Sequence, residues 1–199
     1  MAVAKEIDTL RGETSDQVIL ANKNSFADAL TGSVLGGSAA VDPVLAPVLI
    51  TSTEVLDPVV DGYITSIAAT LVEVHVIGGQ RAIAGTVAAN LATRVFKVVR
   101  HEGADRYATA VDAMAHHFSK GASPNHFVMA SGLSFADALV GSVYAGRSTL
   151  PMVLTDPSKL PNATGDYLAA RADDIDLGTV IGGSKAVSDA VLDYTLLIY

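Results

Sequence analysis

The chain has 199 residues, 50% of them hydrophobic and 17% charged, a composition typical of a folded protein and unlike that of a disordered one. Its 13 Lys and Arg against 21 Asp and Glu give a net charge of −8, which argues against binding nucleic acid through a basic surface. The lack of cysteine excludes disulfides, zinc–thiolate sites and thiol nucleophiles.

In chain order, residues 1–16 have neither the basic nor the apolar region of a signal peptide, and no later stretch predicts a transmembrane helix. Continuous apolar runs predict strands covered on both faces at residues 17–22, 47–51, 72–78 and 96–100. Helical patterns lie between them at residues 27–36, 58–70 and 83–93, the second with Asp57 as N-cap and Pro58 in its first turn.

The same order of elements then returns. A helical stripe of Tyr107, Val111, Met114 and Phe118 precedes predicted strands at residues 126–131, 151–155, 177–182 and 195–199. The letters SFADAL at residues 25–30 recur at 134–139, a shift of 109, and VIGG at 76–79 recurs at 180–183, a shift of 104. The five-residue difference predicts an insertion in a connection of the first copy.

The repeat defines the expected fold class. We predict an α/β protein of two tandem small three-layer modules, Rossmann-like or Toprim-like, with mainly parallel sheets flanked by helices. The predicted modules are residues 1–99 and 100–199. When the two copies are aligned, residue 1 matches a position inside the helix that opens the second copy. We therefore expect this chain to be a fragment that lacks a preceding segment.

Four motifs in the second copy carry a family resemblance. In order they are RHEGADRYATAV at 100–111, SGLSFADAL at 131–139, LPMVLT at 150–155 and VIGGSKAVS at 180–188. They resemble the cell wall binding type 2 repeat of Gram-positive surface proteins. The resemblance implies a non-enzymatic anchoring module, usually in three tandem copies, that holds a surface protein on an anionic secondary polymer of the cell wall.

The resemblance also implies a location and partners. It places the protein outside the cell, at the cell wall or cell surface, with neighbouring repeat modules as partners and without a cofactor. Because this chain carries two copies in place of three, an apolar face between modules is expected to stay exposed and to favour self-association into a homo-oligomer.

Asp28 and Asp137 are the acidic residues inside the repeated SFADAL motif. Each falls in the first turn of a predicted helix, where a carboxylate accepts backbone N–H groups and meets the positive end of the helix dipole. No partner base, acid or nucleophile is repeated at a fixed spacing. We therefore interpret both aspartates as structural and predict no catalytic residue.

Paired glycines end a predicted strand in each copy. They permit a tight strand-to-helix turn, and they are Gly78, Gly79, Gly182 and Gly183. Two positions after the second glycine comes a basic residue, Arg81 in one copy and Lys185 in the other. Both are candidate polymer-binding residues, with a solvated surface charge as an equally good interpretation.

The motif that leads the second copy adds three candidates. Asp105 is the expected N-cap of the helix that runs to Phe118. Arg100 and Arg106 are candidate polymer-binding residues, although we favour for Arg106 a role in clamping the two modules together. The five histidines show no ligand spacing in the sequence, so no metal site is predicted.

Two other functions remain open. The first is a small α/β enzyme that acts on a phosphorylated or glycosidic substrate at the carboxyl ends of the strands. The second is a purely structural oligomerisation domain within a surface layer. An asymmetric cluster of titratable residues in one cleft would favour the enzyme, whereas assembly without polymer binding would favour the structural domain.

Overall fold

The computed structural model describes residues 1–37, 45–94, 97–118 and 125–198. Its first half contains α1 Ala2–Arg11, β1 Gln17–Asn22, α2 Phe26–Gly37, β2 Val48–Thr51, α3 Pro58–Ser66, β3 Glu73–Ile77, α4 Gly85–Ala92 and β4 Lys97–His101. Its second half contains α5 Arg106–Phe118, β5 His126–Ser131, α6 Phe135–Ser148, β6 Met152–Thr155, α7 Asn162–Ala169, the 3-10 turn Ala172–Asp174, β7 Leu177–Ile181 and α8 Asp189–Leu196. The insertion predicted in the first copy falls largely at residues 38–44, outside the described residues.

Both sheets are parallel. The first has the strand order β2-β1-β3-β4 and the second the order β6-β5-β7. Shifting β2, β3 and α4 by 104 residues gives the bounds of β6, β7 and α8, and shifting β1 by 109 gives those of β5. The predicted fold class is therefore confirmed: two parallel α/β sheets flanked by helices follow one another along the chain.

Side chains alternate between the two faces of the first sheet. Val18 and Leu20 of β1 pack with α3 and α4 in one core, whereas Ile19 of β1 and Ile77 of β3 face α2 in another. All four side chains are almost wholly buried, which explains why the strands are continuous apolar runs in the sequence. The second core continues from α2 through the whole second module, so one hydrophobic core spans the junction.

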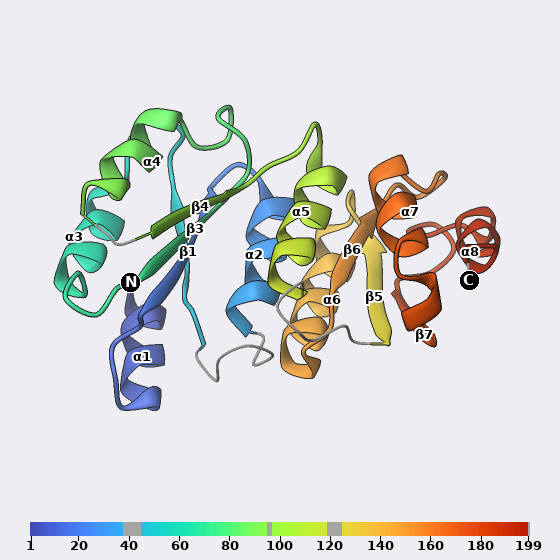
Figure 1. The fold of residues 1–199 in the computed structure, drawn as a ribbon, viewed down its shortest axis with the longest axis horizontal. Coiled ribbons are helices and arrows are strands. Elements are labelled where there is room, and N and C mark those ends of the chain that lie inside the picture. The colour runs from blue at the N-terminus through green and yellow to red at the C-terminus, as the bar shows by residue number, and fades with distance from the viewer. Residues whose placement is uncertain (38–44, 95–96, 119–124, 199) are drawn as a thin grey trace.

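Helices from both modules meet at this junction. In Figure 1, α2, α5 and α6 lie between the two sheets, and α2 packs against both α5 and α6. Helices α2 and α6 approach closely at Gly37 and Gly146, where a side-chain carbon added to Gly146 would lie 3.3 Å from the Gly37 Cα. The rings of Phe26 and Phe135 meet edge to face, with centroids 5.8 Å apart.

Two details differ from the sequence-based expectations. Residues 195–199 are not a strand over the part that the structure describes, because Thr195 and Leu196 complete α8. With the shift of 104, residues 195–198 correspond to residues 91–94 at the end of α4 and not to β4, so this apolar run was assigned to the wrong kind of element. Strand β4 also crosses the predicted boundary between residues 99 and 100 and pairs with β3 of the first sheet.

Candidate functional site

The repeated glycine turns and the repeated aspartates are packing partners. Gly78 and Gly182 follow β3 and β7 with φ of +106° and +119°, a backbone conformation that favours glycine. A side-chain carbon at Gly78 would lie 2.8 Å from an Asp28 oxygen, and one at Gly182 would lie 3.0 Å from an Asp137 oxygen. The two motifs thus recur together because each module packs the first turn of a helix against the end of a strand.

The Asp28 carboxylate is buried at the module junction. The Ser25 side chain interacts with this carboxylate. Burial raises the pKa of Asp28, an effect that the Ser25 hydrogen bond and the positive charge of Arg106 partly offset. Asp137 occupies the same place in the second module but is only half-buried, because no module covers it among the described residues.

Arg106 joins the two modules. Its guanidinium lies over the Phe26 ring, 5.7 Å from the centroid, and its Nη1 donates to the Gly132 carbonyl at 2.7 Å. It also attracts the Asp28 carboxylate across the junction. These contacts support the clamping role, and polymer binding by Arg106 stays a proposal.

Arg100 lies near the end of β4, close to the turn at Gly78. Its Nη1 donates to the Gly78 carbonyl at 2.6 Å, and its Nη2 is buried without a hydrogen bond among the described residues. Burial lowers the pKa of Arg100, and the Glu102 charge opposes this shift. One terminal nitrogen of this guanidinium, Nη1, thus holds the glycine turn.

Arg81 and Lys185 differ from the two junction arginines. Both are exposed, Arg81 in the turn after β3 and Lys185 in the turn after β7, and thus belong to different modules. The structure therefore brings Arg100 and Arg106 to one junction and leaves Arg81 and Lys185 as separate surface cations.

Asp105 is the N-cap of α5, as predicted. Its Oδ1 accepts hydrogen bonds from the backbone N–H groups of Tyr107 and Ala108, each at 2.9 Å. Asp57 caps α3 in the same way through Val59, with Pro58 in the first turn.

We expect Asp105→Ala to lower the free energy of unfolding by about 0.5–2 kcal/mol, because two N–H groups of the first turn lose their acceptor. Urea unfolding followed by circular dichroism measures the change. Asp105→Asn is the control, since asparagine caps as well as aspartate. Equal stability of the alanine variant and the parent chain would contradict the capping role.

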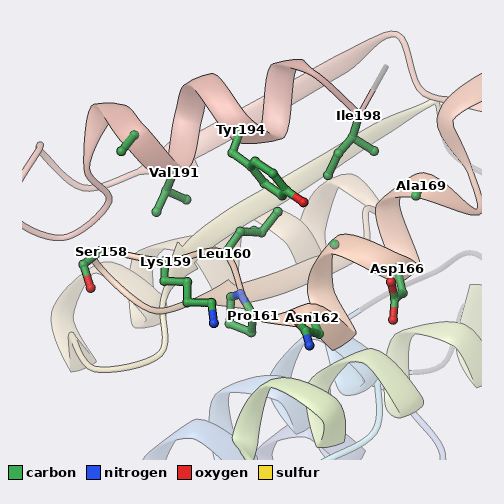
Figure 2. Close-up of a pocket in the computed structure, with 12 residues that line it drawn as sticks. Ser158, Lys159, Leu160, Pro161, Asn162, Asp166, Ala169, Val191, Tyr194 and Ile198 are labelled. Atoms are coloured by element: carbon green, nitrogen blue, oxygen red, sulfur yellow. The ribbon is translucent and has the colours of Figure 1, made fainter.

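A groove opens between α7 and α8 of the second module. Its volume is about 470 Å³, within the range of small-molecule sites. In Figure 2, side chains of the segment that leads into α7 face those of α8 across it, and the labelled residues are Ser158, Lys159, Leu160, Pro161, Asn162, Asp166, Ala169, Val191, Tyr194 and Ile198. The lining thus combines apolar side chains with a cation, an amide, a carboxylate and a phenol.

The first module has a groove at the repeat-equivalent place, between α3 and α4. Its volume is about 330 Å³. Arg94 and Asp61 form a 2.6 Å ion pair there, at the positions that Ile198 and Gly165 occupy in the second module. The two grooves are thus alike in place but differ in lining, and among the described residues no such ion pair crosses the larger one.

The lining of the larger groove differs from that of most glycosidase active sites. Asp166 is the single carboxylate among its lining residues, all of which the structure describes. Hydrolysis of a glycosidic bond uses two facing carboxyl groups in most families. Sequence reasoning missed Lys159 and Tyr194, because the first copy has Val55 and Asn90 at these positions and no repeated motif marks them.

Three histidines from separate elements meet beside the junction. His75 of β3, His101 of β4 and His116 of α5 bring one ring nitrogen each within 4.8 Å of the others. The sequence, in which the histidines show no ligand spacing, did not predict this cluster, in which the His75 Nδ1 lies 2.9 Å from the His101 Nε2. No local motif could have indicated this cluster, because 26 and 15 residues separate the three histidines along the chain.

The comparisons with known proteins point to one class. Residues 100–192 match the model of a family described as cell wall binding domain 2. The chain is 24% identical over 179 residues to the N-acetylmuramoyl-L-alanine amidase LytC of Bacillus subtilis (strain 168). This alignment covers 85% of the chain and 34% of LytC, so the chain spans about a third of that relative.

Two solved structures share the fold. Cwp6 from Clostridium difficile matches 92% of this chain and 28% of its own with a TM-score of 0.79 and 22% identity. Cwp8 from Clostridium difficile matches 96% of this chain and 31% of its own with a TM-score of 0.76 and 19% identity. At this level of identity the likeness concerns the fold.

The fold and the groove thus define the class of this chain: it is a parallel α/β repeat protein with an open outer groove. The match of residues 100–192 to the cell wall binding domain 2 family confirms the resemblance found in the sequence motifs. This match gives residues 100–192 a cell wall binding role. Within the described residues, no helix is long and apolar enough to cross a membrane.

Proposed function

We propose that this chain anchors a surface protein non-covalently by binding an anionic secondary polymer of the cell wall. The observation that carries the proposal is the family match over residues 100–192, which includes the residues that line the larger groove except for Tyr194 and Ile198. The protein would act outside the cell, at the cell wall or cell surface, and without catalysis.

The groove between α7 and α8 is the proposed polymer contact. The exposed ring of Tyr194 offers a flat apolar face to a sugar ring and a hydroxyl for a hydrogen bond. The exposed ammonium of Lys159 supplies a positive charge for a phosphate or carboxylate of the polymer. Asn162 and Asp166 provide hydrogen-bonding groups for sugar hydroxyls.

Surface cations at the ends of strands are a second part of the proposal. Lys159 and Lys185 follow β6 and β7, whose carboxyl ends share one edge of the second sheet. The two connections are tied together, because the backbone N–H of Ser188 donates to the Pro157 carbonyl at 2.9 Å. We propose that Lys185 extends the cationic contact along this edge and that Arg81 does the same in the first module.

The exposed face of α6 is the proposed contact for a further repeat module. Four of its side chains, Leu139, Val140, Val143 and Tyr144, are 40–60% exposed. Their equivalents in α2 are at most 6% exposed, because α5 and α6 cover them; they are Leu30, Thr31, Val34 and Leu35. A further module that packs on α6 as the second module packs on α2 would cover this apolar face. Where no further module is present, self-association of the chain would cover the face instead.

We expect Lys159→Ala and Tyr194→Ala each to weaken binding to purified cell walls about tenfold, or about 1.4 kcal/mol. Lys159→Ala should also reduce the salt dependence, since exposed ionic contacts are screened over about 8 Å at physiological ionic strength. Asn90→Ala, at the position equivalent to Tyr194, is the control. Binding is measured by sedimentation with walls before and after extraction of the secondary polymer.

The same assay separates the alternatives. Equal retention on stripped walls would overturn the polymer as the ligand, and parental binding by both groove variants would overturn the groove as its site. Arg81→Ala and Lys185→Ala, compared at low and high salt, test the additional cations. Assembly without wall binding would support the purely structural oligomerisation domain.

A further inference from the structure

We propose that His75, His101 and His116 form a binding site for a divalent transition metal ion such as zinc, which links the first sheet to the leading helix of the second module. Strands β3 and β4 supply two of these side chains, and helix α5 supplies the third. The site is independent of the groove and of the polymer.

The rings of His75 and His101 bring two nitrogens close together. They are stacked, with an interplanar angle of 13° and centroids 5.2 Å apart, and the nearest nitrogens are 2.9 Å apart. The His116 ring stands at 65° to His101, with centroids 5.0 Å apart, so it approaches the pair from a third direction. Three imidazoles from different directions match the ligand set of a tetrahedral zinc site, in which a water or another group takes the fourth position.

The outer nitrogens of the stacked pair point at carboxylates. His75 Nε2 lies 3.6 Å from Glu73 Oε1, and His101 Nδ1 lies 3.4 Å from Asp112 Oδ2. The Glu73 carboxylate is held in turn by Lys97 at 2.9 Å. Histidines that bind metal ions almost always donate the second ring N–H to a carboxylate, a carbonyl or a water.

Because of these carboxylates, His75 and His101 are better suited to binding an ion between them than to a direct hydrogen bond with each other. Each carboxylate favours a proton on the outer nitrogen, which leaves the inner nitrogen of each neutral ring with a lone pair. Two lone pairs that face each other at 2.9 Å repel, so in the absence of an ion one inner nitrogen must carry a proton. A cation between the rings accepts both lone pairs while both outer N–H groups keep their carboxylates.

The chemistry and the distances limit the choice of ion. Buried imidazole ligands suit zinc, copper, nickel or cobalt, whereas calcium and magnesium prefer oxygen ligands. Metal–nitrogen bonds of about 2.0–2.1 Å in a tetrahedral site separate the nitrogens by roughly 3.4 Å. The stacked pair must therefore open slightly and His116 must move closer.

The experiment titrates zinc into the chain, prepared without an affinity tag and treated with a chelator. We expect one ion per chain by isothermal titration calorimetry, a rise in the thermal unfolding midpoint, and visible absorption bands of tetrahedral cobalt when cobalt replaces zinc. His116→Ala should weaken zinc binding by at least the about 10–100-fold that loss of an outer carboxylate typically causes. His126→Ala, which removes a histidine of β5 outside the cluster, should bind like the parent.

A second variant keeps the test decisive if His116→Ala does not fold. Asp112→Asn alters a half-exposed side chain that is not itself a ligand, and it should weaken zinc binding about 10–100-fold. The proposal is overturned if the parent chain binds no zinc, or if His116→Ala and Asp112→Asn both bind it as tightly as His126→Ala does. Polymer binding plays no part in these measurements, so the outcome is separate from that of the cell wall assay.

Discussion

Val34→Asp is expected to prevent stable folding, whereas Val143→Asp, the same change at the equivalent position of the second copy, should leave stability almost unchanged. Val34 is completely buried in α2 where the two modules meet, and Val143 is 56% exposed on α6. An unpaired charge at a fully buried position costs about 3–5 kcal/mol, a large share of the about 5–15 kcal/mol by which folded proteins are stable. Surface substitutions usually stay within about 0.5 kcal/mol.

Circular dichroism with urea unfolding measures both variants under the same conditions. Similar losses of stability in the two would mean that the junction between the modules does not bury α2 in solution. Val143→Asp also tests the proposed contact of α6, because a charge in the centre of the apolar face should reduce self-association in sedimentation velocity. Unchanged self-association of this variant would assign the contact to another surface.

Gly78→Ala is expected to lower the free energy of unfolding by about 2–4 kcal/mol. The φ of +106° is strained for alanine, and the added carbon would lie 2.7 Å from the Ala82 side chain as well as 2.8 Å from Asp28. Gly62→Ala is the matched control. Gly62 lies within α3 with no other atom within 4 Å of an added carbon, so this change should stabilise the chain by about 0.5–1 kcal/mol.

A double variant separates the two causes. Asp28→Ala combined with Gly78→Ala removes the contact with the carboxylate but keeps the backbone strain and the contact with Ala82. We therefore expect partial recovery relative to Gly78→Ala alone, measured by urea unfolding. A Gly78→Ala variant as stable as the Gly62→Ala control would contradict the packing role of the glycine turn.

Local signals in the sequence were enough for most of the secondary structure. Asp105 and Asp57 cap α5 and α3 because an N-cap acts on the next two or three residues, which are neighbours in the sequence as well. The repeat placed the strands of the second sheet, since two copies of one unit bury the same faces. The predicted strand at residues 195–199 was wrong because a short apolar run is equally compatible with the end of a helix.

By itself, the sequence determined the α/β repeat, the caps, the glycine turns and the resemblance to the cell wall binding family. Only the tertiary structure decided that the apolar face of α2 is buried and the equivalent face of α6 is exposed, as Val34 and Val143 show. It alone joined His75, His101 and His116 and formed the groove of Lys159 and Tyr194. The physical reason is that caps and periodicity depend on neighbours along the chain, whereas burial and clustering depend on residues brought together from distant elements by the packing of two modules.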